Sequence, residues 1–143
     1  MVVCLWWFIT LVLAGLGLVL GGAHVYELPV RVAYEPRFYM QVTSTLYQYF
    51  GLVGGPLQVL ALLFALGLSW RTRDRVSFRW TAAGTAFLAL SLLAWFLLVQ
   101  PVNAAWFEAL RAGPGDAVAA YADLRSRWEG GHAAAFAAWL TGF

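Results

Sequence analysis

Two short clusters of side chains in this sequence could do chemistry. His24 is followed by Glu27, and Glu129 is followed by His132, so each cluster holds a carboxylate and an imidazole three residues apart. On a helix this spacing places both groups on one face. A histidine held in this way can act as an acid or a base, or bind a metal ion. Because ionisable groups at the edge of a lipid-facing segment are costly, both clusters are candidates for a functional site.

The composition predicts the elements that must position these clusters. The chain has 143 residues, of which 62% are hydrophobic and 11% charged, and this excludes an ordinary soluble globular protein. Three stretches without Asp, Glu, Lys or Arg, 1–26, 38–70 and 80–107, exceed the ~20 residues that a helix needs to cross a bilayer, and a fourth, 130–143, reaches that length only by taking in charged residues before it. They lack the alternation of a membrane β-barrel. We therefore predict an all-α membrane protein, a single four-transmembrane-helix bundle over 1–143, with spans near 2–23, 44–69, 80–101 and 116–141.

An arginine-rich loop predicts the orientation of this bundle. Four arginines lie between the second and third spans, at positions 71, 73, 75 and 79. Because positive residues favour cytoplasmic loops, both termini are predicted to be cytoplasmic, in a bacterial inner membrane. The same topology places five tryptophans at one interface, namely Trp6, Trp7, Trp70, Trp80 and Trp139. The expected partner is the lipid bilayer rather than nucleic acid, and the single cysteine, Cys4, excludes an internal disulfide.

Two glycine pairs have the spacing that lets membrane helices approach closely. Gly17 and Gly21 form the first pair, and Gly51 and Gly55 the second. Packing between helices of the same chain is the expected use of both. Pro56 follows the second pair and predicts a bend in the second span, because proline removes a backbone donor.

Several polar side chains fall toward the outer side of the predicted bundle. Glu27 and Arg31 are four residues apart and can pair on one helix. Arg127 and Glu129 are two apart, so they do not share a face and each should find a partner on another span. These groups could serve only to hold helices together, or they could form a site. The other members of the set are His24, Gln100, Asn103, Asp123, Arg125 and His132.

Two kinds of metal centre are conceivable from these residue types. Carboxylates and histidines on two helices bind iron or manganese in helical bundles, and the set here is His24, Glu27, Glu129 and His132. The two histidines could instead be axial ligands of haem b. Counting residues from Trp7 and Trp139 at 1.5 Å each predicts that the histidines differ in height by about 15 Å. A polar cavity reaching down to His132 is therefore favoured over a shared metal site.

Three motifs resemble a bacterial membrane family of unknown function that is related to the anthrone oxygenases of polyketide pathways. They are Ala23-His-Val-Tyr-Glu-Leu-Pro29, Pro101-Val-Asn-Ala-Ala-Trp106 and Leu124-Arg-Ser-Arg-Trp-Glu-Gly-Gly-His-Ala133. The resemblance implies four transmembrane helices and a polar site made by Asn103, Trp106, Arg127, Trp128 and His132. It also implies the insertion of oxygen into an electron-rich aromatic substrate without an obvious cofactor. The segment from Tyr47 to Gly51 departs from the family pattern, so the resemblance does not supply substrate contacts from the second span.

The sequence therefore supports three hypotheses. The first is an oxidoreductase or oxygenase-like protein that acts on a lipophilic substrate near the outer leaflet. Its predicted catalytic residues are His132, Glu129, Arg127 and Asn103, and its predicted substrate-binding residues are Trp106, Trp128, His24 and Glu27. The second is a non-catalytic small subunit of a larger membrane complex, whose polar residues serve packing and contacts with other membrane subunits. The third is a b-type haem protein.

Overall fold

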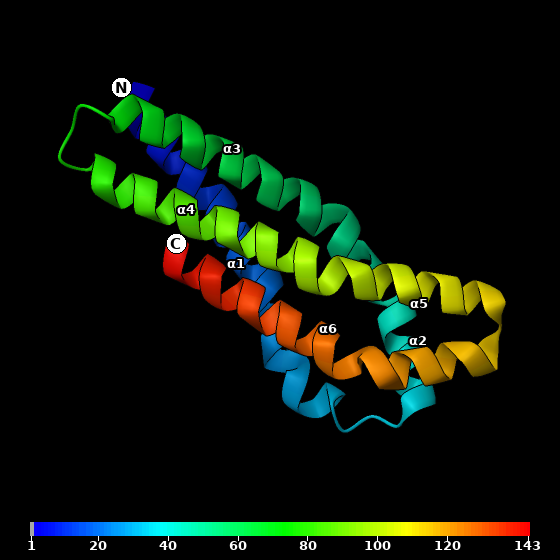
Figure 1. Cartoon of the computed structure of the whole chain (residues 1–143). Helices are drawn as coiled ribbons and strands as arrows, with labels where there is room; N and C mark the ends of the chain where they lie inside the picture. The colour runs from blue at the N-terminus through cyan, green and yellow to red at the C-terminus, as the bar shows by residue number, and fades with distance from the viewer. Residues whose placement is uncertain (1) are drawn as a thin grey trace.

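The computed structural model describes residues 2–143, and nearly all of them are helical (Figure 1). No strand occurs within this range, which confirms the all-α prediction. The segments η1 and η2 are π-helical. The elements in chain order are α1 (Val2–Arg31), α2 (Pro36–Thr45), η1 (Phe50–Gly54), α3 (Gly55–Thr72), α4 (Phe78–Ala94), η2 (Trp95–Val99), α5 (Gln100–Ala112) and α6 (Pro114–Gly142).

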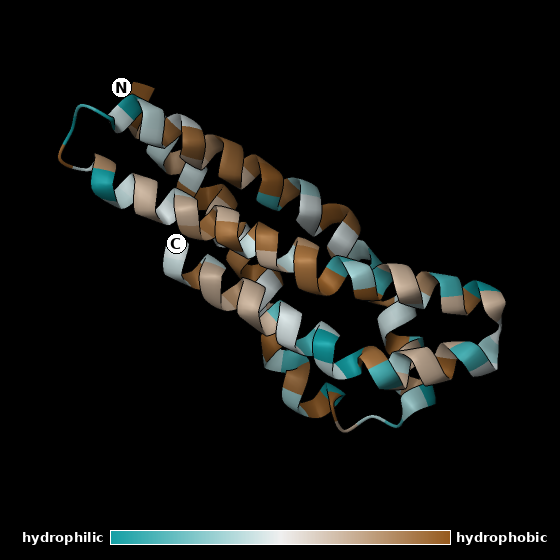
Figure 2. Ribbon diagram, in the orientation of Figure 1, coloured by the Kyte–Doolittle hydropathy of each residue, from teal (hydrophilic) through white to brown (hydrophobic). Residues whose placement is uncertain are grey.

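Three continuous helical runs are long and apolar enough to cross a membrane. They are Val2–Arg31, Phe50–Thr72 and Phe78–Ala112. The helix α6 is about as long as α1, but it carries Arg125, Arg127 and Glu129 near its middle. Figure 2 shows the same contrast, because α3 and α4 are largely brown whereas the central part of α6 is teal.

The long helices pack as a ring. α1 contacts α3, α3 contacts α4, α4 contacts α6, and α6 returns to α1. Figure 1 shows α3 and α4 as an antiparallel hairpin whose loop lies at the end that carries the N-terminus. The short helix α2 packs on α6 toward the opposite end, where α5 also lies against α6. The C-terminus stops beside Gly84 of α4, short of the hairpin loop.

The first glycine pair brings α1 and α6 together as predicted. A Cβ on Gly17 would lie 2.5 Å from the Trp139 ring, and one on Gly21 would lie 3.1 Å from the Phe136 ring. The second pair does not serve this purpose, because no described atom lies within 4 Å of a Cβ at Gly51 or Gly55. For that pair the prediction of a close helix contact is wrong.

Trp139 corrects the predicted tryptophan belt. Its ring is buried, with 1% exposed, and its indole N–H donates to the Ala14 carbonyl at 2.9 Å. Trp70 and Trp80, in contrast, are exposed. Because Ala14 lies seven residues beyond Trp7, the two tryptophans differ in height by about 10 Å. The assumption that Trp7 and Trp139 lie in one plane is wrong, and so are the heights of His24 and His132 that were derived from it.

Prolines account for both departures from regular α-helix. Pro56 follows η1 and Pro101 follows η2, and each removes the N–H that an α-helix would donate four residues back. The bend expected near Pro56 thus takes the form of a π-helical segment. Helices also run past their predicted ends: α1 continues through Pro29 to Arg31, and the third run continues to Ala112.

Candidate functional site

His24 of α1 and His132 of α6 lie against each other. Their ring centroids are 4.2 Å apart, with an angle of 30° between the ring planes. The predicted difference in height of about 15 Å, from 1.5 Å per helical residue, is therefore wrong. The reason is the position of Trp139 beside Ala14, which raises the whole of α6 relative to α1. The two predicted clusters form one site.

A buried ion pair lies beside the histidines. The Arg31 guanidinium donates to both carboxylate oxygens of Glu129, at 2.7 Å from Nε and 2.5 Å from Nη2. The side chains of the two residues are almost completely buried, with 2% and 6% exposed. Such bidentate geometry is the strongest form of this contact. The prediction that Glu129 finds its partner on another helix is confirmed, and that partner is Arg31.

Arg31 has no donor left for a ligand. Its Nη1 donates to the Tyr47 hydroxyl at 2.9 Å and to Glu27 at 3.4 Å, and its Nη2 also donates to the His24 carbonyl at 3.0 Å. Together with the bonds to Glu129, these contacts occupy all five N–H groups of the guanidinium. The Tyr47 hydroxyl also hydrogen-bonds Glu27. The predicted local pair of Glu27 and Arg31 is confirmed, and Arg31 acts as the structural centre of this end of the bundle.

The carboxylate of Glu129 is occupied as well. Its Oε1 accepts a hydrogen bond of 2.9 Å from the Tyr39 hydroxyl of α2. Burial raises the pKa of Tyr39 well above its ordinary value, and the neighbouring Glu129 carboxylate raises it further, so the phenol stays a donor. The guanidinium of Arg125 covers the Tyr39 ring at 4.0 Å and donates to the carbonyls of Arg31, Val32 and Tyr34, at the end of α1 and just after it. These contacts favour a structural role for Glu129 over a catalytic one.

A cavity of about 430 Å³ lies in front of the histidines. Its volume falls within the range of small-molecule sites, and aromatic side chains make up much of its wall. Phe96 and Phe107 line it and are also 65% and 58% exposed, so they stand at its mouth on the outer surface of the bundle. The other aromatic wall residues are Tyr47, Phe50, Trp95, Trp106, Tyr121, Trp128, Phe136 and Trp139.

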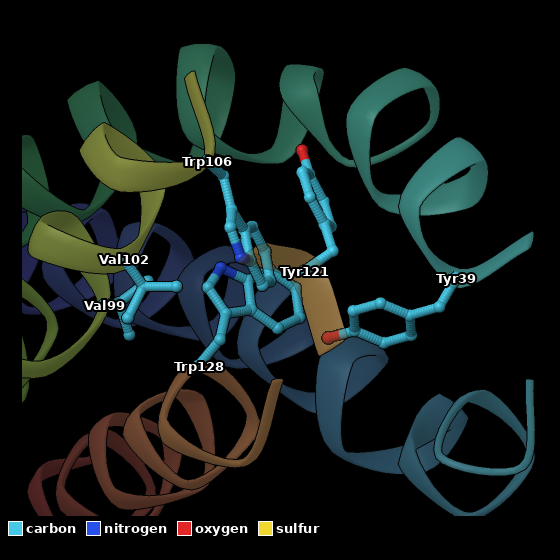
Figure 3. Packing of buried hydrophobic residues seen from close by; sticks show 6 residues of the cluster. All are labelled: Tyr39, Val99, Val102, Trp106, Tyr121 and Trp128. Atoms are coloured by element: carbon cyan, nitrogen blue, oxygen red, sulfur yellow. The ribbon is translucent and has the colours of Figure 1, made fainter. Parts of the chain in front are cut away.

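The aromatic wall is held by hydrogen bonds as well as by packing. Trp106 stacks on Tyr121 with centroids 4.0 Å apart and planes at 9°, and Figure 3 shows the two rings facing each other beside Trp128. The Trp128 indole N–H donates to Oδ1 of Asn103 at 2.9 Å. Because an indole nitrogen can only donate, this bond fixes the amide and leaves the NH₂ group of Asn103 for a cavity ligand.

One hydrogen bond fixes the tautomer of His132. Its Nδ1 lies 3.0 Å from the Trp128 carbonyl oxygen, which can only accept, so Nδ1 carries the proton. The neutral ring then has its lone pair on Nε2, and His132 lines the cavity. His24 also lines the cavity, is 94% buried, and has no partner for its Nδ1 among the described residues. The wall thus offers a base and an unpaired imidazole nitrogen.

The donor set does not fit the predicted metal centres. Axial haem ligands would approach one iron end to end from opposite faces, with ring centroids roughly 6 Å apart for metal–nitrogen bonds of about 2 Å. The 4.2 Å between His24 and His132 leaves no room for a macrocycle. Among residues 2–143 no three His, Cys, Asp or Glu side chains are grouped to hold a metal ion. Glu129 is turned to Arg31 and Tyr39 instead.

The structure separates the predicted site residues into three groups. Asn103, Trp106, Trp128, His24 and His132 line the cavity. Glu27 and Glu129 belong to the network around Arg31. Arg127 is exposed and donates to the Leu97 carbonyl at 3.5 Å, the group that Pro101 leaves without its α-helical donor.

Comparison of the chain with protein-family models, with curated proteins and with solved structures finds no match.

Proposed function

We propose that the chain is a four-span integral protein of the bacterial inner membrane, with α6 as the fourth span and both termini in the cytoplasm. The ring of long helices supports this proposal, since α6 packs along both α1 and α4. A cysteine-labelling experiment tests it in a Cys4→Ser background. We expect Ala33→Cys to react with a membrane-impermeant thiol reagent on intact cells and Val76→Cys to react only after lysis. The reverse pattern would contradict the orientation.

We further propose that the protein is an oxygenase-like enzyme for a lipophilic aromatic substrate. The observation that carries this proposal is the aromatic cavity, which opens on the apolar outer surface and holds His24 and His132 in its wall. An exposed phenylalanine pair at the mouth allows entry from the hydrocarbon layer, where such a substrate dissolves. The resemblance of three sequence motifs to a family related to the anthrone oxygenases agrees with this chemistry.

The reaction that suits these groups is the oxidation of an activated CH₂ group by O₂. Nε2 of His132 accepts a proton from the CH₂ carbon, and the NH₂ group of Asn103 donates to the conjugated oxygen on which the electron pair collects. O₂ takes up the electrons and forms the new C–O bond. Loss of the second C–H proton and cleavage of the O–O bond give a C=O group and water, so one CH₂ and one O₂ yield one C=O and one H₂O.

Filling the cavity tests this function. Gly51 lines the cavity and has open space beyond its Cβ position, so Gly51→Leu adds a large side chain at the cavity wall without a clash. Gly130 is also helical and unobstructed but lies outside the cavity, which makes Gly130→Leu the matched control. With anthrone as substrate, we expect membranes containing the wild type to consume O₂. Because a side chain that competes with the substrate for space costs about 1–3 kcal/mol, Gly51→Leu should lower the rate at least about fivefold while the control retains it.

Two outcomes would contradict the proposal in different ways. If the wild type consumes no more O₂ than membranes without the protein, the oxygenase activity is refuted. If Gly51→Leu and Gly130→Leu have the same rate as the wild type, the activity does not use this cavity.

A further inference from the structure

We propose that the arginine-rich end of the bundle contains a specific site for the headgroup of an anionic phospholipid. A second cleft of about 460 Å³ lies there between α1, α3 and the loop after α3. Its residues belong to the start of α1, the end of α3 and the loop after α3, and Figure 1 shows these segments together at the hairpin-loop end of the long helices. Its wall consists of Trp6, Gly67, Trp70, Arg71, Arg73 and Asp74.

The guanidinium of each arginine of this cleft lies over the ring of a tryptophan. The guanidinium carbon of Arg71 lies 4.8 Å from the Trp6 ring centroid, and that of Arg73 lies 4.3 Å from the Trp70 ring centroid. A stacked guanidinium is bound through its face and keeps the N–H donors of its edge free. The N–H donors of two guanidinium groups in one cleft can bind the two unesterified oxygens of a phosphodiester.

The support beneath Arg71 is rigid. The Trp6 ring fills the space that a side chain at position 67 would need, since a Cβ on Gly67 would lie 2.4 Å from it. The same ring packs on Phe64 with a centroid distance of 5.0 Å. Because Trp6 is fixed by these contacts, Arg71 loses less side-chain freedom when it binds an anion.

The charge of the cleft favours an anion. Asp74 is the acidic member of the wall, and it lies 3.6 Å from Nε of Arg73. Its side chain is 90% exposed and that of Arg73 is 49% exposed, so this ion pair is weak and does not cancel the arginine. With two arginines and one exposed carboxylate, the cleft has a net positive charge.

The neighbouring surface indicates a lipid rather than a free phosphate. Leu63 and Leu66 lie one helical turn before Gly67 and Trp70, on the same faces of α3, and they are 55% and 50% exposed. Figure 2 shows this part of α3 in brown next to the teal loop. Leu5 of α1 adds another exposed apolar side chain at this end. Acyl chains can lie on these faces while the phosphate reaches the arginines.

Native mass spectrometry of the full chain in detergent tests the site. We expect the wild type to bind phosphatidylglycerol at least about tenfold more tightly than phosphatidylcholine, and the double variant Arg71→Ala/Arg73→Ala to lose this preference. The matched control is Arg75→Ala/Arg79→Ala, which removes the same charge from the same end of the bundle but outside the cleft. It should retain most of the preference. The single variant Arg73→Ala, on an exposed side chain, gives the same test without loss of the Arg71 contact to Trp6.

Three results would overturn the proposal. Equal losses in the two double variants would show a general attraction to positive charge rather than a site. Equal binding of the two lipids by the wild type would show that the headgroup charge is not recognised. Complete displacement of the lipid by millimolar inorganic phosphate would show a phosphate site that does not use the acyl chains. None of these results depends on the oxygenase activity.

Discussion

Glu129→Gln is expected to lower the free energy of unfolding by about 3–5 kcal/mol, because it leaves the buried charge of Arg31 without its main counter-ion. The carboxylate of Glu27, at 3.4 Å from Nη1, is half exposed to solvent, so its contact with Arg31 is too weak to replace that of Glu129. Denaturation in detergent, followed by circular dichroism, measures the loss. The matched control is Glu27→Gln, which removes the other carboxylate from the same guanidinium and should cost less than about 1 kcal/mol.

The double variant Arg31→Met/Glu129→Gln sharpens this test. If the pair is a structural unit, removing both charges should give a protein more stable than Glu129→Gln alone, since no buried charge then remains uncompensated. If the loss in the double variant equals the sum of the losses in Arg31→Met and Glu129→Gln, or if Glu129→Gln and Glu27→Gln lose equally, the role assigned to the pair is contradicted.

His132→Ala is expected to lower kcat about 10²–10⁴-fold, the usual contribution of a positioned general base, with a smaller change in KM. The reason is the loss of the Nε2 lone pair, which the bond from Nδ1 to the Trp128 carbonyl leaves as the basic nitrogen of a ring that lines the cavity. Initial rates of O₂ consumption against substrate concentration measure both constants.

Two control variants separate chemistry from packing. His132→Phe keeps an aromatic ring against His24 and Trp128 but has no base, so it should be as inactive as His132→Ala. Arg127→Ala should change the rate by less than about twofold, because this side chain is exposed and bonds the Leu97 carbonyl outside the cavity. An active His132→Phe would exclude a role for His132 as base.

The helical class was readable from the sequence because charge is absent from whole spans of lipid-crossing length. The local pairs were readable too: Glu27 and Arg31 are four residues apart and do meet. The spacing of seven residues between His24 and Arg31 also indicated that these two residues lie on one face of their helix. These inferences required only the geometry of a single helix.

The height of α6 relative to α1 could not be predicted from the sequence in the same way. It depends on the contact of Trp139 with Ala14, whose residues are 125 positions apart. A tryptophan near the end of an apolar segment is typical of a membrane interface, but this one is buried because a main-chain carbonyl accepts its N–H and Gly17 makes room for its ring. The same limit applies to Arg31 and Glu129, which are 98 positions apart.

Nuclear magnetic resonance of the protein labelled with ¹⁵N in histidine tests the central claim most directly, because the chain has only two histidines. We expect two imidazole signals with a through-space contact between them, one of them in the tautomer protonated at Nδ1, and we expect both to shift when a planar aromatic ligand such as anthraquinone is added. Two imidazoles without mutual contact, or signals that such a ligand leaves unchanged at saturation, would contradict the account of the cavity as the functional site.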